Sequence, residues 1–250
     1  MKNTKIDYVF LGSSRVQNHI VTKLVEKETG KKALNLGVQG GKLDDVSLLL
    51  KLLKQNNNTF EKVLIQVDYL YNYESPSTIV GCESLPYIRS NDIVKKHVKE
   101  NNPDYEQNHN VPFYRYNVND FKLGFREFFS SLINKKARLD LSDGFEAKNQ
   151  KFRKSNYKLP QNIADKNDDL IAIQTFCKEN KIEVVYFCAP FCKYAGNLEY
   201  VEKLKVKIPE LRDFSKAISD DDYFKDCAHL NGKGAELFTK MLVDSCLVKK

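Results

Sequence analysis

The sequence predicts an α/β protein built on a parallel sheet. Short apolar runs recur along the chain, amphipathic segments of helical period separate them, and the order at the start is strand, helix, strand, helix, strand. Strands that are joined through helices pair in parallel, with right-handed crossovers. A chain of 250 residues is long enough for one sizeable α/β domain, so we expect residues 1–250 to form a single domain.

The elements are regular in the first third of the chain. Val16 and Ile20 belong to an apolar series with the spacing of an amphipathic helix, and Gly30 is typical of a helix end. Asp44 and Asp45 are acidic residues of the kind that favours a helix N-terminus. The pattern predicts strands at 5–11, 33–36 and 62–68 and helices at 15–30 and 44–55.

Regular alternation stops between about residues 72 and 165. This stretch is rich in aromatic side chains, Asn and Lys, and its pattern predicts helices near 91–100 and 119–135. A long insertion at a strand end is usually a lid or a binding wall, so we expect one here, after the third strand, rather than a second domain. The alternation resumes with a helix at 165–180, a strand at 181–190, a helix at 197–206, a short strand or loop at 210–220 and a C-terminal helix within 229–250.

Composition excludes several classes of protein. Hydrophobic residues make up 42% of the chain and charged residues 29%, which is the balance of a folded domain rather than of a disordered chain. No window approaches roughly 18 consecutive apolar residues, so we expect no membrane span. The first strand is predicted close to Met1, without a signal-peptide core. The chain as written is expected in the cytoplasm; the alternative is a membrane-anchored or exported protein whose N-terminal segment has been removed.

The net charge of +7 invites a nucleic-acid partner, but the distribution of basic residues argues against one. The arginines are scattered singly, whereas surfaces that clamp phosphates favour Arg in clusters. We therefore expect no nucleic-acid partner. The basic stretches at 135–138 and 148–158 are interpreted as solvated surface, with contact to an acidic partner as the alternative.

The six cysteines predict neither a disulfide framework nor a metal site. A chain of this length has no need of disulfide staples, and the one close pair, Cys188 and Cys192, lacks a second pair or a nearby histidine for zinc. Because Cys188 ends an apolar strand, we expect it to be a buried, reduced thiol. The set favours a reducing compartment.

A pair of serines follows the first predicted strand, at the edge where parallel sheets bind ligands. Ser13 and Ser14 lie on the turn into a helix, where a hydroxyl is exposed near the positive helix end and an oxyanion is favoured. The alternative is a helix N-cap, which is common for serine at this position.

Asp226 and His229 form the second candidate cluster. With two residues between them, the carboxylate can accept a hydrogen bond from Nδ1 of the imidazole, which leaves Nε2 to face a nucleophile. The alternative is a helix-capping aspartate beside a surface histidine. Nucleotide loops are excluded, because residues 37–42 lack the spacing of a Walker loop and no Gly-x-Gly-x-x-Gly follows a strand. We expect no cofactor and no metal.

Together these residues resemble the SGNH, or GDSL-type, hydrolase family. Residues 12–14, Gly-Ser-Ser, match the first block of the family, Gly-Asp-Ser. Ser13 replaces the usual Asp, as in the variant branch of D-alanyl-lipoteichoic acid and polysaccharide O-acyl-modifying proteins. Residues 35–40 match the second block, Asn-x-x-x-x-Gly, and residues 226–234 match the last, Asp-x-x-His-Leu-Asn-x-x-Gly. The third block departs, because residues 67–72 read Val-Asp-Tyr-Leu-Tyr-Asn and no Asn stands at the expected position.

The resemblance implies a flavodoxin-like three-layer α/β/α sandwich and a serine esterase or O-acyltransferase that acts on an acylated carbohydrate or a related ester. The implied triad is Ser14 as nucleophile, His229 as base and Asp226 as the group that orients His229. The backbone N–H groups of Ser14 and Gly40 would form the oxyanion hole. The oligomeric state is not defined.

The residues that bind the substrate and the presence of catalytic activity are both left open by the sequence. The candidates for substrate binding are Arg15, Asp68, Tyr69 and Asn72, with Asn72 also a candidate for the missing oxyanion donor. For Arg15, an outward-facing helix arginine is the alternative. For the whole chain, the alternative is a non-catalytic carbohydrate-binding or assembly protein in a surface polysaccharide pathway.

Overall fold

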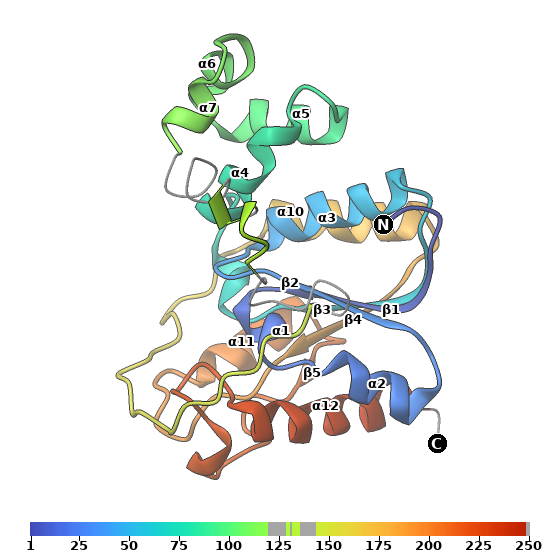
Figure 1. Cartoon of the computed structure of the whole chain (residues 1–250). Helices are drawn as coiled ribbons and strands as arrows, with labels where there is room; N and C mark the ends of the chain where they lie inside the picture. Colours follow the sequence, from blue (N-terminus) through green and yellow to red (C-terminus); the bar gives the residue numbers. More distant parts are fainter. Residues whose placement is uncertain (120–128, 131, 136–143, 249–250) are drawn as a thin grey trace.

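The centre of the fold is a five-stranded sheet whose strands pair in parallel. The computed structural model describes residues 1–119, 129–130, 132–135 and 144–248. The strand order is β2-β1-β3-β4-β5 (Figure 1), which is the flavodoxin-like order and confirms the predicted α/β fold. The strands are β1 (Lys5–Gly12), β2 (Ala33–Gly37), β3 (Thr59–Gln66), β4 (Glu183–Cys188) and β5 (Arg212–Asp213).

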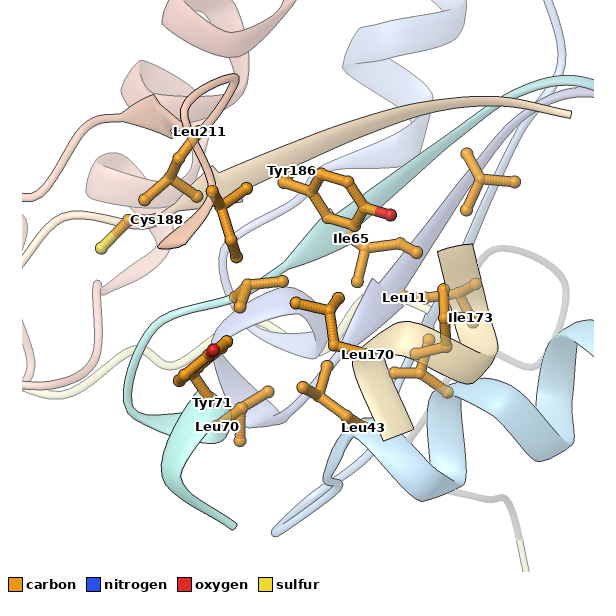
Figure 2. Close-up of a cluster of buried hydrophobic side chains, with 14 of the residues drawn as sticks. Leu11, Leu43, Ile65, Leu70, Tyr71, Leu170, Ile173, Tyr186, Cys188 and Leu211 are labelled. Atoms are coloured by element: carbon orange, nitrogen blue, oxygen red, sulfur yellow. The ribbon is translucent and has the colours of Figure 1, made fainter. Parts of the chain in front are cut away.

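Helices cover both faces of the sheet and produce three layers (Figure 1). Side chains alternate along β1, so Val9 and Leu11 join one buried cluster while Tyr8 and Phe10 join another on the opposite face. Figure 2 shows part of the first cluster, including Leu11 and Leu43. The first cluster contains residues of α3 (Leu43–Gln55), α10 (Asp168–Glu179) and α11 (Glu199–Lys207), and the second contains residues of α2 (Thr22–Thr29) and α12 (Gly232–Cys246).

The helix predicted at 15–30 is interrupted. The structure has α1 (Ser14–Gln17), a break, and then α2, which ends at Gly30 with a φ of 70°. The side-chain amide of Asn35 on β2 donates to the carbonyls of Val16 at 2.8 Å and Ile20 at 3.0 Å. In a continuous helix these two carbonyls would accept hydrogen bonds from backbone N–H groups. The amide of Asn35 replaces those donors, so neither carbonyl is left without a hydrogen bond at the break.

The segment after β3 divides into two parts. The first part forms short helices with a small apolar cluster of their own, and Figure 1 shows α5, α6 and α7 beyond the layer of α3 and α10. The second part, residues 144–158, has little regular structure and extends toward the C-terminal half. The predicted helix near 91–100 is α5, and most of the one near 119–135 lies outside the described residues. The helices of the first part are η1 (Tyr69–Asn72), α4 (Thr78–Ser84), η2 (Leu85–Tyr87), α5 (Asp92–Asn101), α6 (Tyr105–Asn110) and α7 (Tyr114–Asn117).

None of the helices in the described part of the chain has the length and apolar character needed to cross a bilayer. A further short helix, η3 (Asp221–Tyr223), precedes the C-terminal helix.

The strands β1 and β3 are neighbours in the sheet, although β2 lies between them in the sequence. Their carboxyl ends therefore meet at the point where the strand order reverses, which is where folds of this type bind ligands.

Candidate active site

The two serines after β1 have different local roles. Ser13 is the N-cap of α1, because its Oγ accepts a hydrogen bond from the backbone N–H of Arg15 at 3.2 Å. Ser14 starts α1, and its Oγ lies 2.9 Å from Nε2 of His229, although 215 positions separate the two residues. The capping interpretation therefore applies to Ser13, and Ser14 provides the hydroxyl that meets the histidine.

His229 contacts Asp226 through its other ring nitrogen. Nδ1 of His229 lies 3.0 Å and 3.2 Å from the two carboxylate oxygens of Asp226. The same carboxylate accepts the backbone N–H groups of Ala228 and His229, at 2.9 and 3.0 Å. It thus caps its own turn, whereas the N-cap of α12 is Asn231.

The carboxyl of Asp226 is ionised at neutral pH. Burial raises its pKa, but the hydrogen bond and charge of His229, together with the backbone donors, outweigh burial, and the pKa lies below its ordinary value. An ionised carboxylate accepts from Nδ1–H of His229, so the imidazole holds its proton on Nδ1. Nε2 is then the nitrogen that can accept the proton of the Ser14 hydroxyl.

The turn that carries Asp226 and His229 is tied to the loop after β4. Cys227 forms a disulfide with Cys192, and the N–H of Cys192 donates to the carbonyl of Cys227 at 3.1 Å. The expectation of no disulfide is wrong for this pair. The two cysteines are 35 positions apart, so their spacing hides the fact that the fold brings their Cα atoms within 4.5 Å. Cys188 is a free and buried thiol, as expected, and burial raises its pKa well above the ordinary value.

A second histidine lies behind His229. The ring centroids of His19 and His229 are 6.1 Å apart, edge to face, and Nε2 of His19 accepts the N–H of Leu230 at 3.0 Å. Burial lowers the pKa of His19 well below its ordinary value, and the charges of Arg15 and His229 add to the effect, so His19 is neutral. His19 thereby fixes the backbone directly after His229. No pattern in the sequence connects it with a residue 211 positions later.

Backbone donors are available at both positions expected for an oxyanion hole. Within the described ranges, the N–H groups of Ser14 and Gly40 have no hydrogen-bond acceptor. Gly40 is exposed with a φ of 65°, a conformation that favours glycine. Its turn is fixed to the end of β1, because Gly41 N–H donates to Val38 O at 2.9 Å and Val38 N–H donates to Gly12 O at 3.0 Å. Joint binding of one oxyanion by both donors stays a prediction.

Arg15 and Asp68 form a buried ion pair. Nη1 of Arg15 lies 2.9 Å from Oδ2 of Asp68, and the two side chains are 1% and 0% exposed. Nη2 donates to the carbonyls of Ala189 and Pro190, each at 2.7 Å, and the guanidinium covers the ring of Phe191. Because both side chains are buried, Arg15 and Asp68 are not placed to contact a substrate as predicted. The alternative prediction, an outward-facing Arg15, is also wrong. Burial raises the pKa of Asp68, and the guanidinium opposes that shift.

Gln66 connects this ion pair to the nucleophile turn. The side chain is fully buried at the end of β3, and its Oε1 accepts the N–H of Ser13 at 2.9 Å and the hydroxyl of Ser13 at 2.8 Å. Its amide nitrogen donates to Asp68 at 2.7 Å. The sequence reasoning missed Gln66. The signal was a single amide directly after the apolar run of residues 63–65, where a buried polar group needs partners.

The other two predicted binding residues have different surroundings. The hydroxyl of Tyr69 lies 3.5 Å from Oγ of Ser13, and burial raises the pKa of Tyr69, so the phenol is protonated beside the nucleophile turn. The amide of Asn72 donates to Asn162 O at 2.7 Å, and its oxygen accepts the hydroxyl of Tyr200 at 2.9 Å. Asn72 is therefore engaged in joining η1 to neighbouring segments, which does not fit the role of a substitute oxyanion donor.

Comparisons with known proteins find no protein-family model and no curated protein that matches the chain. In the part of the chain that the structure describes, no group of three or more His, Cys, Asp or Glu side chains could hold a metal ion.

One similar solved structure is a protein assigned to the G-D-S-L lipolytic family from Desulfitobacterium hafniense DCB-2. It has 13% identity and a TM-score of 0.43, and the match covers 95% of this chain and 97% of that chain. Another is a protein assigned as a platelet activating factor from Streptococcus pneumonia, with 14% identity, a TM-score of 0.45, and coverage of 97% and 84%. At these identities and scores, no function is carried over from either protein.

Proposed function

We propose that the chain is a serine esterase or O-acyltransferase that uses Ser14, His229 and Asp226. One observation carries this proposal: a continuous series of polar contacts runs from Asp226 to Nδ1 of His229 at 3.0 Å and from Nε2 of His229 to Ser14 Oγ at 2.9 Å. A nucleophile, a base and an orienting carboxylate in hydrogen-bond contact meet the geometric requirement for nucleophilic acyl transfer.

The proposed reaction proceeds in two halves. Ser14 Oγ bonds to the ester carbonyl carbon while its proton passes to Nε2 of His229, and the N–H groups of Ser14 and Gly40 stabilise the oxyanion. The intermediate collapses, the C–O bond to the alcohol breaks, and His229 returns the proton to the leaving oxygen. Water or a sugar hydroxyl then attacks the acyl-enzyme with His229 again as base, and Ser14 is regenerated.

The substrate class of this proposal is an acylated carbohydrate or a related ester, and it rests on the resemblance of the three motif blocks. The second candidate function is a non-catalytic carbohydrate-binding or assembly protein of the same fold. The engagement of Asn72 with Asn162 and Tyr200 favours this candidate, since it leaves the third oxyanion donor without a replacement among the residues expected to supply it. Loss of one such donor costs about 10²–10³ in rate.

Hydrolysis of p-nitrophenyl acetate by the wild type, Ser14→Ala and Ser13→Ala separates the two candidates. We expect Ser14→Ala to lower kcat by a factor on the order of 10⁴ or more. Ser13→Ala keeps the Ser14–His229 contact and loses a helix cap, so it should lose far less activity. A folded wild type without measurable turnover, or equal losses in the two variants, would overturn the catalytic proposal.

A further inference from the structure

A basic segment of the chain lies between the end of α1 and the start of α12. Residues 146–155 connect the two elements that carry the triad. At one end, the N–H of Glu146 donates to the carbonyl of Gln17, at the end of α1, at 3.0 Å. A little further on, the carbonyl of Lys148 accepts the N–H of Gly232, at the start of α12, at 3.1 Å. A substrate that reaches Ser14 and His229 would therefore have this segment at its flank.

This segment forms one wall of a cleft of about 630 Å³. Lys148, Lys151 and Phe152 of this segment line the cleft together with Asp222, Asn231 and Lys233. Asn231, one of the lining residues, follows His229 by two positions in the chain. We refer to these six residues as the lysine cleft.

The charge of the lysine cleft is positive. Residues 148–158 contain five Lys or Arg and no Asp or Glu. Lys148 pairs with Glu146 at 2.9 Å, but Lys151 and Lys233 have no carboxylate within 4.0 Å among the residues that the structure describes. The ammonium groups of Lys151 and Lys233 are thus available to a ligand. The lining contains one carboxylate, that of Asp222.

One lining residue of the cleft, Phe152, contacts a second aromatic side chain. Phe152 stacks on Tyr194 with ring centroids 6.2 Å apart. The ammonium groups of Lys154 and Lys193 lie 4.4 Å and 5.1 Å from the centre of the Tyr194 ring, and Lys193 is also paired with Asp221 at 3.3 Å. Half-exposed apolar faces beside several ammonium groups suit a ligand with both a ring face and negative charge. An inorganic anion would use the charge alone.

We propose that the lysine cleft binds an anionic group, a carboxylate or a phosphate, on a carbohydrate chain whose ester is presented to Ser14. This inference rests on the proposed function and adds the charge class of its substrate. Lysine ammonium groups act as point charges for either anion, without the planar fork that arginine offers. A negatively charged polymer also gathers faster at a surface of opposite sign.

Affinity electrophoresis tests the proposal with three polymers: polygalacturonate, which carries carboxylates, phosphorylated starch, which carries phosphates, and unmodified starch. We expect the wild type to be retarded by at least one anionic polymer and not by starch, and we expect the retardation to fall as salt rises. Lys151→Glu with Lys233→Glu should weaken binding about tenfold, since exposed ion pairs are individually modest. The matched control is Lys32→Glu with Lys95→Glu, which makes the same charge change on exposed lysines outside the cleft.

Each outcome decides one question. Equal retardation by starch, no retardation by any polymer, or equal losses in the two double variants would overturn the lysine cleft. Tighter binding of a single-stranded oligonucleotide than of both anionic polymers would also overturn it, in favour of a nucleic-acid surface. The esterase assay on the same wild-type protein separates this inference from the proposed function: a folded wild type that binds the anionic polymers without esterase turnover supports the cleft and contradicts only the catalytic proposal. Ser14→Ala, which should lose esterase activity, is expected to bind the polymers as tightly as the wild type.

Discussion

The two sides of the proposed triad are held in place by different means. On the nucleophile side, an interior network joins the ends of β1, β3 and β4, and its side chains are fully buried: Ser13, Arg15, Gln66 and Asp68. On the histidine side, the side chains of Asp226 and His229 are 24% and 27% exposed, and a disulfide and backbone hydrogen bonds hold their turn.

This difference separates two kinds of substitution. A change in the buried network leaves polar groups unpaired in the interior, so it should lower the free energy of unfolding together with activity. A side-chain change at Asp226 or His229 alters groups that solvent can reach, so it should lower activity with a smaller loss of stability; the disulfide that ties their turn is the exception, because it restricts the unfolded chain. Four substitutions test this distinction, beginning with the largest expected effect.

Asp226→Asn should reduce kcat by roughly 10³–10⁴-fold, because an amide cannot hold His229 with its proton on Nδ1. The pKa of Asp226 is lowered in the folded protein. Its stabilising contribution is therefore present above the pH at which the carboxyl ionises in the unfolded chain, about 4, and is lost as the pH falls through the lower folded value. Urea unfolding at pH 7 and pH 3 should show a modest difference between wild type and variant at pH 7 and a smaller one at pH 3.

Arg15→Met should lower the free energy of unfolding by about 3–5 kcal/mol, because it leaves Asp68 as an uncompensated charge in the interior. Replacing both partners, Arg15→Met with Asp68→Leu, should recover much of this loss. Urea denaturation of the single and double variants measures both effects. A loss below about 1 kcal/mol in the single variant would remove the distinction between the two sides of the triad.

Cys192→Ala with Cys227→Ala should cost about 2–4 kcal/mol of stability, since the disulfide no longer restricts the unfolded chain. In conditions where the variant remains folded, kcat should fall, because the turn of Asp226 and His229 loses its tie to the loop after β4. Cys188→Ala, at a buried thiol outside the disulfide, is the matched control. Alkylation of unfolded wild type without reductant should modify four of its six cysteines, and modification of all six would contradict the disulfide.

Gln66→Leu is expected to have the smallest effect of the four, about 1–3 kcal/mol, because it leaves the N–H and hydroxyl of Ser13 without their acceptor. Gln66→Glu keeps an acceptor for Ser13 but places a second carboxylate beside Asp68, so it should be worse than Leu. Thermal melts with the esterase assay check the order. Equal stability of the two variants would show that the contact with Asp68 is unimportant.

Much of the fold could be predicted because its elements are local patterns. Strands and helices are identified within a few residues of their observed ends by the apolar period, by Gly30 and by the acidic pair in the first turn of α3. The break between α1 and α2 could not be predicted in this way, because the hydrogen bonds to its carbonyls come from the amide of Asn35 on a separate strand.

The residues of the site also differ in whether local sequence patterns predict them. Ser14, Asp226 and His229 belong to short motifs, and the structure brings them into contact. The buried position of Arg15 depends on the carboxylate of Asp68, 53 positions away, and the disulfide depends on two loops from different parts of the sequence. Contacts between distant segments leave no periodic trace in a single sequence, so residues that support the site were harder to predict than residues that form it.

The central claim is that Ser14 is a nucleophile activated by His229. Reaction with a fluorophosphonate, followed by intact-mass measurement and peptide mapping, tests it most directly, because the phosphonyl group bonds covalently to an activated serine. We expect a single adduct on the peptide that contains Ser14, lost in Ser14→Ala and strongly slowed in His229→Ala. A folded wild type that gains no adduct at neutral pH, or an adduct that persists in Ser14→Ala, would contradict it.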